Sequence, residues 1–414
     1  MFENVYPREK YLCKIRPFYN SDIIKIITGI RRCGKSFIMK AIMNELLNNG
    51  VSESQIIYIP LDQRGFKNIK KPEELESKIE SFLGREEKYY LFVDEVQNVH
   101  GFESVIHAYA EEGFSIFLTG SNSYLLSDEI STKLTGRYLN FETFTLDFAE
   151  FLDMKRFFKE EVNQDVYTEF EEYLINGGFP KTLEFDGIFA RQTYTRGIVN
   201  EIFEKDVKKR RKIVNVPVFE RVQSFLLNNY SAPFSLDSLL KCLEKEGYKT
   251  KATTVRGYIE DLKKAKIVYE CNRFDLKSKR AVRREQKYYL ADLAIYFAMN
   301  TDNSISFGPS LENVVYLYFA SHDYQISVGK IGNFECDFIL RDKKGEYAYI
   351  QVAYTLQGEN QKATSRIKER EYRPFREIKD GYPRYLISLD RFRDQQEGVH
   401  HINAIDLFLG KETI

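Results

Sequence analysis

The sequence has little of what marks several common classes of protein. Its 414 residues include no tryptophan and only five cysteines, with no CxxC pair and no metal-ligand spacing. The scattered thiols argue against a disulfide framework or a zinc site, and they predict a reducing compartment. No segment reaches the ~18 apolar residues of a membrane span, and the N-terminal residues MFENVYPREKYL lack the apolar core of a signal peptide. We therefore expect a soluble, cytoplasmic protein with no membrane partner.

An excess of one charge is also missing. The chain carries 61 Lys and Arg against 61 Asp and Glu, so the net charge gives no sign of a nucleic-acid partner. Any such sign must come from local clusters of basic residues. The chain is long enough for two or three domains, and its 43% apolar residues are enough for each domain to bury a core.

Short apolar runs alternate with helical patterns over residues 22–122. The runs are IIKIITG, QIIYIPLD, YYLFVDE and FSIFLTG, and helical segments lie between them. Apolar strands of this length, separated by helices, are typical of a parallel sheet that is covered on both faces. The sequence therefore predicts an α/β core in this part of the chain.

A phosphate-binding loop follows the first of these strands. Residues Gly29–Ser36 read GIRRCGKS, which fits the pattern G-x-x-x-x-G-K-[ST] between a strand and a helix. The glycines let backbone N–H groups surround a phosphate, Lys35 places a positive charge on the β- and γ-phosphates, and the Ser36 hydroxyl can bind Mg²⁺. We predict ATP and Mg²⁺ as ligands. The residues expected to contact the nucleotide are Gly29, Ile30, Arg31, Arg32, Cys33, Gly34, Lys35, Ser36 and Phe37.

Polar residues further along the chain complete a predicted hydrolysis site. The apolar run YYLFV ends in Asp94 and Glu95, which suit Mg²⁺ binding and orientation of the attacking water. Ser121 and Asn122 follow the run FSIFLTG, where one of them can contact the γ-phosphate or either can cap a helix. Arg137 can stabilise transition-state charge, in its own subunit or across a subunit boundary, or it can form a structural ion pair.

Residues 146–275 have mainly helical patterns, and their later part predicts a winged helix. Helical segments at 218–230, 235–247 and 252–265 precede two strand-like segments joined by a basic loop. Together with Arg256, the basic residues that could contact DNA phosphates are Lys208, Lys209, Arg210, Arg211, Lys212, Lys277, Lys279, Arg280, Arg283, Arg284 and Lys287. A solvated surface or a protein–protein module is the alternative interpretation.

Ten motifs extend over nearly the whole chain. They are GIRRCGKS, YYLFVDEVQNV, FLTGSNSYLLS, LTGRYLNFETFTLDFAEFL, YLINGGFPKTL, KYYLADLAI, LENVVYLYF, ECDFIL, YIQVAY and EREYRPFREIKDGYPRYLISLD. The set resembles a bacterial and archaeal family that couples an AAA-type ATPase module to a winged helix and a C-terminal restriction-endonuclease-like domain. The first three motifs are general to the superfamily, and the others are specific to the family.

The resemblance implies an α/β fold in four parts. These are a P-loop parallel-sheet ATPase core at 1–145, a helical lid at 146–212, the winged helix at 213–295 and the restriction-endonuclease-like α/β domain at 296–414. The resemblance also places Gly177–Pro180 in the lid, where a tight backbone approach or a plain helix end would need its glycines.

The resemblance further implies a nuclease site in the C-terminal domain. Such a site holds Mg²⁺ with carboxylates and uses a Lys two residues beyond the second acid. Glu312 and Asp337 match the carboxylates, but Gln351 stands at the second acid and Ala353 at the Lys. We therefore predict a vestigial site at Glu312, Asp337 and Gln351 that is catalytically degenerate. Two alternatives remain open: Lys362 or Lys368 as a migrated lysine, and Arg373 or Arg376 as an ion-pair partner of Asp337.

The predicted function is an AAA-type ATPase that hydrolyses ATP with Mg²⁺ and couples its nucleotide state to DNA or a partner protein. One alternative is a slow nucleotide-dependent switch that controls oligomerisation, so a homo-oligomer is an open expectation. The other is an ATP-gated nuclease, which the missing lysine disfavours.

Overall fold

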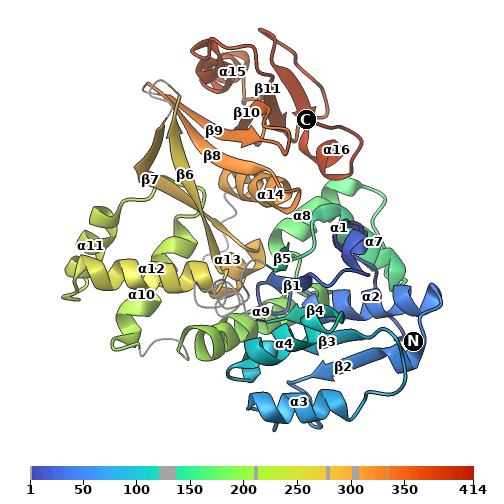
Figure 1. Ribbon diagram of the computed structural model, residues 1–414. Helices are drawn as coiled ribbons and strands as arrows, with labels where there is room; N and C mark the ends of the chain where they lie inside the picture. Colours follow the sequence, from blue (N-terminus) through green and yellow to red (C-terminus); the bar gives the residue numbers. More distant parts are fainter. Residues whose placement is uncertain (1, 121–136, 209–212, 277–279, 301–306, 333) are drawn as a thin grey trace. The chain divides into compact units, whose positions relative to one another are not determined.

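A computed structural model describes residues 2–120, 137–208, 213–276, 280–300, 307–332 and 334–414 (Figure 1). The chain divides into two compact units, Met1–Thr145 and Leu146–Ile414, called here the first and the second unit. Each unit contains one sheet. Among the described helices, none has the length and apolar character that crossing a membrane requires.

The first unit is built on five parallel strands. The strands are β1 (Ile24–Gly29), β2 (Ile56–Pro60), β3 (Tyr90–Asp94), β4 (Ser115–Thr119) and β5 (Tyr138–Thr143). The α-helices are α1 (Glu9–Ile15), α2 (Lys35–Asn48), α3 (Pro72–Glu80) and α4 (Phe102–Glu111). The strand order is β2-β3-β4-β1-β5, and every neighbouring pair is parallel. The predicted parallel-sheet α/β core is confirmed.

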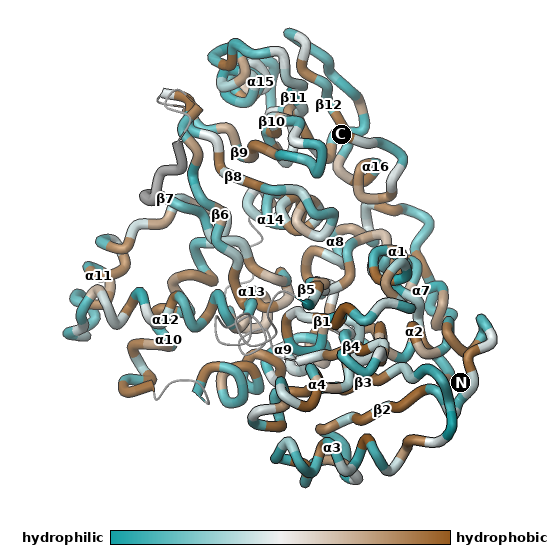
Figure 2. The backbone as a smooth tube through the Cα atoms, in the orientation of Figure 1, coloured by the Kyte–Doolittle hydropathy of each residue, from teal (hydrophilic) through white to brown (hydrophobic). Residues whose placement is uncertain are grey.

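The sheet of the first unit is covered on both faces. Ile24 and Ile26 of β1 belong to one apolar cluster with residues of α3 and α4, whereas Ile27 belongs to another with residues of α1 and α2. Because successive side chains of a strand point to opposite faces, a strand between two layers is buried along its whole length, as β1, β3 and β4 are. Figure 2 shows the apolar character of β2, which is largely brown.

The second unit starts with helices and ends with a mixed sheet. Its α-helices are α7 (Phe148–Phe157), α8 (Val166–Asn176), α9 (Ile188–Ile202), α10 (Val216–Asn228), α11 (Leu236–Lys245), α12 (Ala252–Lys264), α13 (Leu293–Met299), α14 (Phe307–Ser321), α15 (Gln361–Arg376) and α16 (Ala404–Phe408). Its strands are β6 (Val268–Asp275), β7 (Arg280–Leu290), β8 (Gln325–Ile331), β9 (Phe334–Arg341), β10 (Tyr347–Val352), β11 (Arg384–Ser388) and β12 (His400–Asn403). A π-helical segment, Phe203–Val207, continues α9.

The sheet of the second unit crosses a predicted domain boundary. Its order is β12-β11-β10-β9-β8-β6-β7, in which β6 and β7 form an antiparallel hairpin and β6 lies parallel to β8. The hairpin was expected to belong to a winged helix that ends at residue 295, separate from the strands after it. Instead one sheet contains both, with Arg273 opposite Val328. The helices α10 to α12 and the hairpin follow in the predicted order, and their assignment as a winged helix stays a prediction.

The glycine pair of the motif YLINGGFPKTL lies against the motif KYYLADLAI. Gly178 N donates a hydrogen bond to Asp292 Oδ2 at 2.8 Å, and Asp292 Oδ1 accepts another from Ala294 N at the start of α13. A Cβ on Gly177 would lie 1.7 Å from Asp292 Oδ1, and one on Gly178 would lie 2.1 Å from Leu146 O. The tight backbone approach, one of the two explanations considered for these glycines, therefore holds.

Candidate functional site

The P-loop lies where β1 ends and α2 begins. β1 ends at Gly29, whose φ of 149° and close approach to β5 leave no room for a side chain: a Cβ would lie 2.1 Å from Thr143 O. Gly34 has a φ of 105°, also in the region that favours glycine, and α2 starts at the next residue. The N-terminal end of a helix presents unpaired N–H groups and a partial positive charge, which suits a phosphate.

Lys35 is buried, and among the described residues its side chain donates hydrogen bonds to neutral acceptors. Its side chain crosses the loop, and Nζ donates to Gly29 O at 3.0 Å and to Ile30 O at 3.2 Å. The residue is 6% exposed. A buried ammonium that is bonded to carbonyl oxygens is stabilised further when an anion replaces them, because hydrogen bonds that involve charged groups are about twice as strong as those between neutral groups. The geometry fits a lysine that exchanges these carbonyls for phosphate oxygens.

Asp94 at the end of β3 lies beside the P-loop serine. Its Oδ1 accepts a hydrogen bond from Thr119 Oγ1, and its carboxylate also takes part in a hydrogen bond with the Ser36 hydroxyl. Burial raises the pKa of the Asp94 carboxyl above its usual value, and the hydrogen bonds of Thr119 and Ser36 oppose that rise. A hydroxyl and a carboxylate suit Mg²⁺, whose other ligands in such sites are water and phosphate oxygens.

Ser36 and Asp94 would form a small set of protein ligands for Mg²⁺. The described residues contain no group of three or more His, Cys, Asp or Glu side chains able to hold a metal ion. A P-loop Mg²⁺ site does not need such a group, because one carboxylate and the nucleotide supply most of its charge. The pair formed by Ser36 and Asp94 therefore fits the ion that the sequence predicts.

Glu95 is held in a bent backbone directly after Asp94. Its φ is 57°, which is uncommon for a residue with a side chain. Its N–H donates to Thr119 Oγ1 at 3.0 Å, and Gln97 Nε2 donates to its carboxylate. Thr119 thus connects both acidic residues, through the Asp94 side chain and the Glu95 backbone.

The sequence interpretation missed three residues of this site. Thr119 is one, although its place at the end of an apolar run was a usable signal. Gln97, two residues beyond the acids, is another. Arg8 is the third: it is 3% exposed, and its Nη1 donates to Cys33 O of the P-loop at 3.0 Å and to Phe144 O at 2.8 Å. Nothing in the sequence around Arg8 indicates this contact, which joins segments far apart in the chain.

Arg137 lies at the wrong edge of the sheet for a role in its own P-loop. It directly precedes β5, and the first residue of β5, Tyr138, is opposite Ile24, whereas Thr143 is opposite Gly29. The five residue-to-residue steps from Ile24 to Gly29 span about 17 Å at ~3.3 Å per step. The own-subunit role is therefore wrong, while the alternative of an ion pair is confirmed: Arg137 Nη1 lies 3.1 Å from Glu111 Oε1. A role across a subunit boundary stays a prediction.

Ser121 and Asn122 lie outside the described residues. Their predicted contact with the γ-phosphate or its water stays untested. The residue that the structure brings to the acids from β4 is Thr119, at the end of the strand.

The predicted nuclease residues meet around an unexpected lysine in the second unit. Lys287 Nζ of β7 lies 2.9 Å from Glu312 Oε1, 2.7 Å from Glu335 Oε1 and 3.6 Å from Asp337 Oδ1. The Lys287 side chain is 3% exposed. Glu312 comes from α14, and Glu335 and Asp337 come from β9. We call Lys287, Glu312, Glu335 and Asp337 the acidic cluster.

The acidic cluster corrects two predictions. Lys287 was expected to contact DNA phosphates from a basic wing, but it is buried among carboxylates. Asp337 was considered as a partner of Arg373 or Arg376, but the cation beside it is Lys287. Arg373 lies over the Phe334 ring, and Arg376 pairs with Glu369 and Glu397.

The other residues considered for the nuclease site bring no positive charge to the acidic cluster. Gln351 Nε2 donates to Glu371 Oε2 at 2.9 Å, and Ala353 is buried in an apolar cluster. Lys368 pairs with Asp394, and Lys362 is exposed on α15. The lysine beside the predicted nuclease carboxylates is therefore Lys287, from the hairpin that precedes them in the chain, and not a lysine of α15.

Charge neighbours shape the pKa values of the acidic cluster. Burial raises the pKa of the Glu312 carboxyl above its usual value and that of Asp337 well above it, and Lys287 opposes both effects. Burial lowers the pKa of Lys287, but Glu312, Asp337 and Glu335 raise it by more. The lysine is therefore held in its charged form.

The basic residues predicted for DNA contact are only partly described. Residues 209–212 and 277–279 lie outside the described part, as do the side chains of 280–284. Thr253 and Arg256 are exposed on α12, whereas Val255, Tyr258 and Ile259 of the same helix are buried. The helix therefore presents a polar face that includes Arg256.

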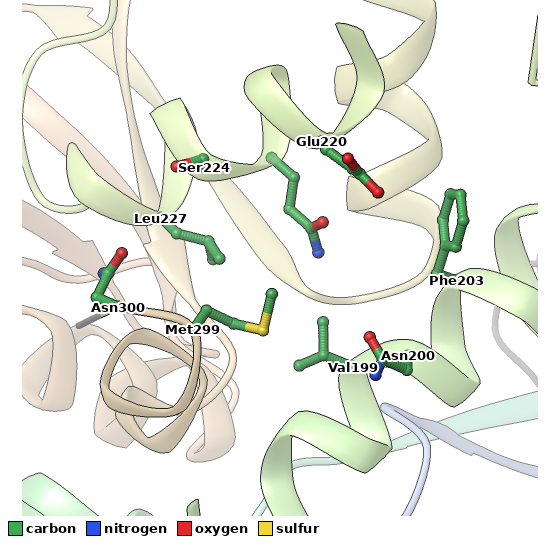
Figure 3. Close-up of a pocket in the computed structure, with 9 residues that line it drawn as sticks. Val199, Asn200, Phe203, Glu220, Ser224, Leu227, Met299 and Asn300 are labelled. Atoms are coloured by element: carbon green, nitrogen blue, oxygen red, sulfur yellow. The ribbon is translucent and has the colours of Figure 1, made fainter. Parts of the chain in front are cut away.

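A cavity of about 210 Å³ lies in the second unit (Figure 3). Its lining residues are Val199, Asn200, Phe203, Glu220, Gln223, Ser224, Leu227, Met299 and Asn300. None of these lining residues is a lysine or arginine, so the cavity does not suit phosphate. It is distinct in its residues from the P-loop and from the acidic cluster.

Comparison with known proteins agrees with the P-loop geometry. Residues 21–152 match a family model described as an AAA domain, and residues 167–305 match one described as a domain of unknown function. An uncharacterized protein of Haemophilus influenzae is 29% identical over 99% of this chain and 100% of its own length. An uncharacterized protein of Methanocaldococcus jannaschii is 28% identical over 92% of this chain and 86% of its own length.

A solved structure extends the likeness beyond the first unit. The Walker-type ATPase PABY2304 of Pyrococcus abyssi has a TM-score of 0.51 and 17% identity, over 72% of this chain and 96% of its own. This likeness concerns the fold. With the parallel sheet, the P-loop and the matched domain model, it shows that the chain contains an AAA-type P-loop ATPase fold.

Proposed function

We propose that this protein binds ATP with Mg²⁺ at the P-loop and hydrolyses it to ADP and phosphate. The observation that carries the proposal is the meeting of Lys35, Ser36 and Asp94 at one edge of the sheet. Because β1, β3 and β4 are parallel neighbours, their carboxyl ends bring the P-loop, the acids and Thr119 together.

Each residue has a distinct chemical task. Lys35 exchanges its bonds to Gly29 O and Ile30 O for phosphate oxygens, while the N–H groups at the start of α2 face the same anion. Ser36 and Asp94 would hold Mg²⁺, which supplies charge neutralisation between the phosphates. Glu95 accepts a hydrogen bond from the attacking water and orients it.

Thr119 and Arg8 act as positioning residues. Thr119 holds the Asp94 side chain and the Glu95 backbone in one arrangement, so the metal ligand and the water-orienting group keep a fixed separation. Arg8 ties Cys33 O to Phe144 O and Thr145 O, which fixes the loop against the end of β5.

The test is the substitution Glu95→Gln in the full chain. We expect nucleotide affinity close to that of the unchanged protein and an ATP turnover reduced by about 10²-fold or more, as for loss of a catalytic base. Glu112→Gln, an exposed glutamate directly after α4, is the matched control and should turn over normally. Normal turnover in Glu95→Gln would show that another group orients the water.

We further propose that nucleotide state is coupled to DNA through α12. The support is the exposed Arg256 near the start of that helix, with exposed Lys249 and Lys251 just before it. Cations on the exposed face of a helix, near its N-terminal end, suit phosphate contact and reading of a groove.

ATPase rates with and without duplex DNA, at two salt concentrations, test this coupling. We expect DNA to raise the rate at low salt, and Arg256→Ala to weaken DNA binding and reduce its salt slope by about 1. Lys241→Ala, an exposed lysine of α11, is the control. Absence of any DNA effect, together with a size change on adding ATP, would favour the oligomerisation switch instead.

A further inference from the structure

The acidic cluster has the carboxylates of a metal site, but a lysine occupies its centre. Glu312 Oε1 accepts hydrogen bonds from Lys287 Nζ at 2.9 Å and from Tyr289 OH at 2.7 Å. Asp337 Oδ2 accepts one from Val352 N at 2.8 Å, while Oδ1 faces Lys287. The carboxylate oxygens that a divalent cation would need already have partners inside the protein.

The position that Lys287 Nζ occupies is also unsuited to Mg²⁺. Mg²⁺ requires about six oxygens at ~2.0–2.1 Å in octahedral arrangement. Here the position between Glu312, Glu335 and Asp337 is filled by a covalently attached ammonium with a 3% exposed side chain. The described residues also hold no metal-binding group of three His, Cys, Asp or Glu side chains.

Both cations of this region come from the hairpin. Arg273 of β6 pairs with Glu335 and with Glu285, and Lys287 of β7 pairs with all three carboxylates of the acidic cluster. The carboxylates come from α14 and β9, which follow the hairpin in the chain. The ion pairs therefore join the hairpin to the C-terminal elements at the place where a nuclease would bind its metal.

We propose that Lys287 permanently takes the place of the divalent cation, so that the acidic cluster is a metal-independent lock between the β6–β7 hairpin and the elements α14 and β9. The C-terminal part of the chain then serves as a scaffold that does not cleave nucleic acid. Glu312, Glu335 and Asp337 hold the hairpin in place through Lys287.

Mn²⁺ binding to the nucleotide-free full chain tests the proposal. An Asp94→Asn background removes the P-loop metal ligand, and electron paramagnetic resonance measures bound Mn²⁺. We expect no bound Mn²⁺ in this background, a gain of about one Mn²⁺ per chain on adding Lys287→Met, and loss of that gain on adding Asp337→Asn. A folded Lys287→Met chain without the gain would overturn the claim that Lys287 stands where a metal would bind.

The parent background keeps the proposal falsifiable if Lys287→Met does not fold. Bound Mn²⁺ that disappears with Asp337→Asn alone would overturn the proposal. The melting temperature gives a second measurement. If it is higher in Mn²⁺ than in EDTA, and this difference disappears with Asp337→Asn, the proposal is also overturned. Cleavage of duplex or single-stranded DNA by the unchanged protein with Mg²⁺, abolished by Asp337→Asn, would also overturn it.

Discussion

Lys35 and Lys287 are both buried, but the groups around their charges differ. Lys35 is 6% exposed and donates to two main-chain carbonyl oxygens, whereas Lys287 is 3% exposed and lies among three carboxylates. The first has neutral partners and gains from a diffusible anion. The second has its anions built into the fold. A buried cation therefore marks a ligand site only when its partners leave its charge uncompensated.

The same contrast appears in the surrounding chain. Around Lys35, Gly29 and Gly34 have φ values of 149° and 105°, which let the backbone turn tightly into a loop whose N–H groups can surround an anion. Around Lys287, side chains from one helix and two strands close over the charges. A site that exchanges a ligand needs the arrangement around Lys35. A fixed connection between two parts of the fold needs the arrangement around Lys287. The predictions below test this difference, from the largest expected effect to the smallest.

Removing Lys287, the cation of the acidic cluster, should destabilise the fold most. We expect Lys287→Met to lower the free energy of unfolding by about 3–5 kcal/mol, because it leaves buried carboxylates uncompensated. Lys343→Met is the matched control, since Lys343 pairs with Asp323 on the surface and should cost at most about 1 kcal/mol. Denaturant titration of both variants measures the difference, and equal stabilities would remove the contrast between the two kinds of ion pair.

Removing Lys35, the cation of the P-loop, should weaken the interaction with the nucleotide and leave the stability of the fold nearly unchanged. We expect Lys35→Ala to reduce ATP turnover by about 10²–10³-fold through lost phosphate contacts. Its unfolding free energy in the absence of nucleotide should change far less than that of Lys287→Met. Lys67→Ala, on an exposed loop of the first unit, is the control. A Lys35→Ala chain as unstable as Lys287→Met would mean that Lys35 is a structural residue.

The link between the acids should matter for chemistry more than for binding. Thr119→Val removes the hydroxyl that contacts Asp94 and the Glu95 backbone, so we expect turnover to fall about tenfold with nucleotide affinity little changed. Thr143→Val is a close control, because the buried Thr143 hydroxyl has no hydrogen-bond partner among the described residues. Equal turnover in the two variants would exclude Thr119 as a positioning residue.

A third buried lysine gives the smallest and most pH-dependent effect. Burial, together with the nearby Lys88, lowers the pKa of Lys25 to about 7, although Nζ donates to Ser115 Oγ at 2.8 Å. The unfolded chain, with a lysine pKa near 10.4, therefore binds more protons between pH 7 and about 10, and stability from this group rises with pH across that window.

Lys25→Met should flatten this dependence. We expect the variant to be more stable than the unchanged protein at pH 7, by about 1 kcal/mol or more, with the difference shrinking toward pH 9. Urea titrations at the two pH values measure it, with Lys67→Met as control. A difference that grows with pH would show that Lys25 is charged and compensated in the fold, like Lys287.

The P-loop core could be predicted from sequence because its signals are local. Strand, glycine loop, lysine, serine and helix are consecutive, and the Asp94–Glu95 pair ends an apolar run. The three helical segments that became α10 to α12, and the strand pair after them, also followed from local patterns. Arg137 could not be placed this way, because motif proximity gives no strand register, and register put it at the opposite edge.

The sequence by itself determined the parallel-sheet core and the chemical type of the phosphate site, because backbone geometry and side-chain chemistry act there over a few consecutive residues. Only the tertiary structure decided where the isolated charges go. It brought Arg8 to the P-loop across 25 positions and Lys287 to Glu312 across 25 positions. Such contacts depend on sheet order and crossover connections, and no local pattern encodes them.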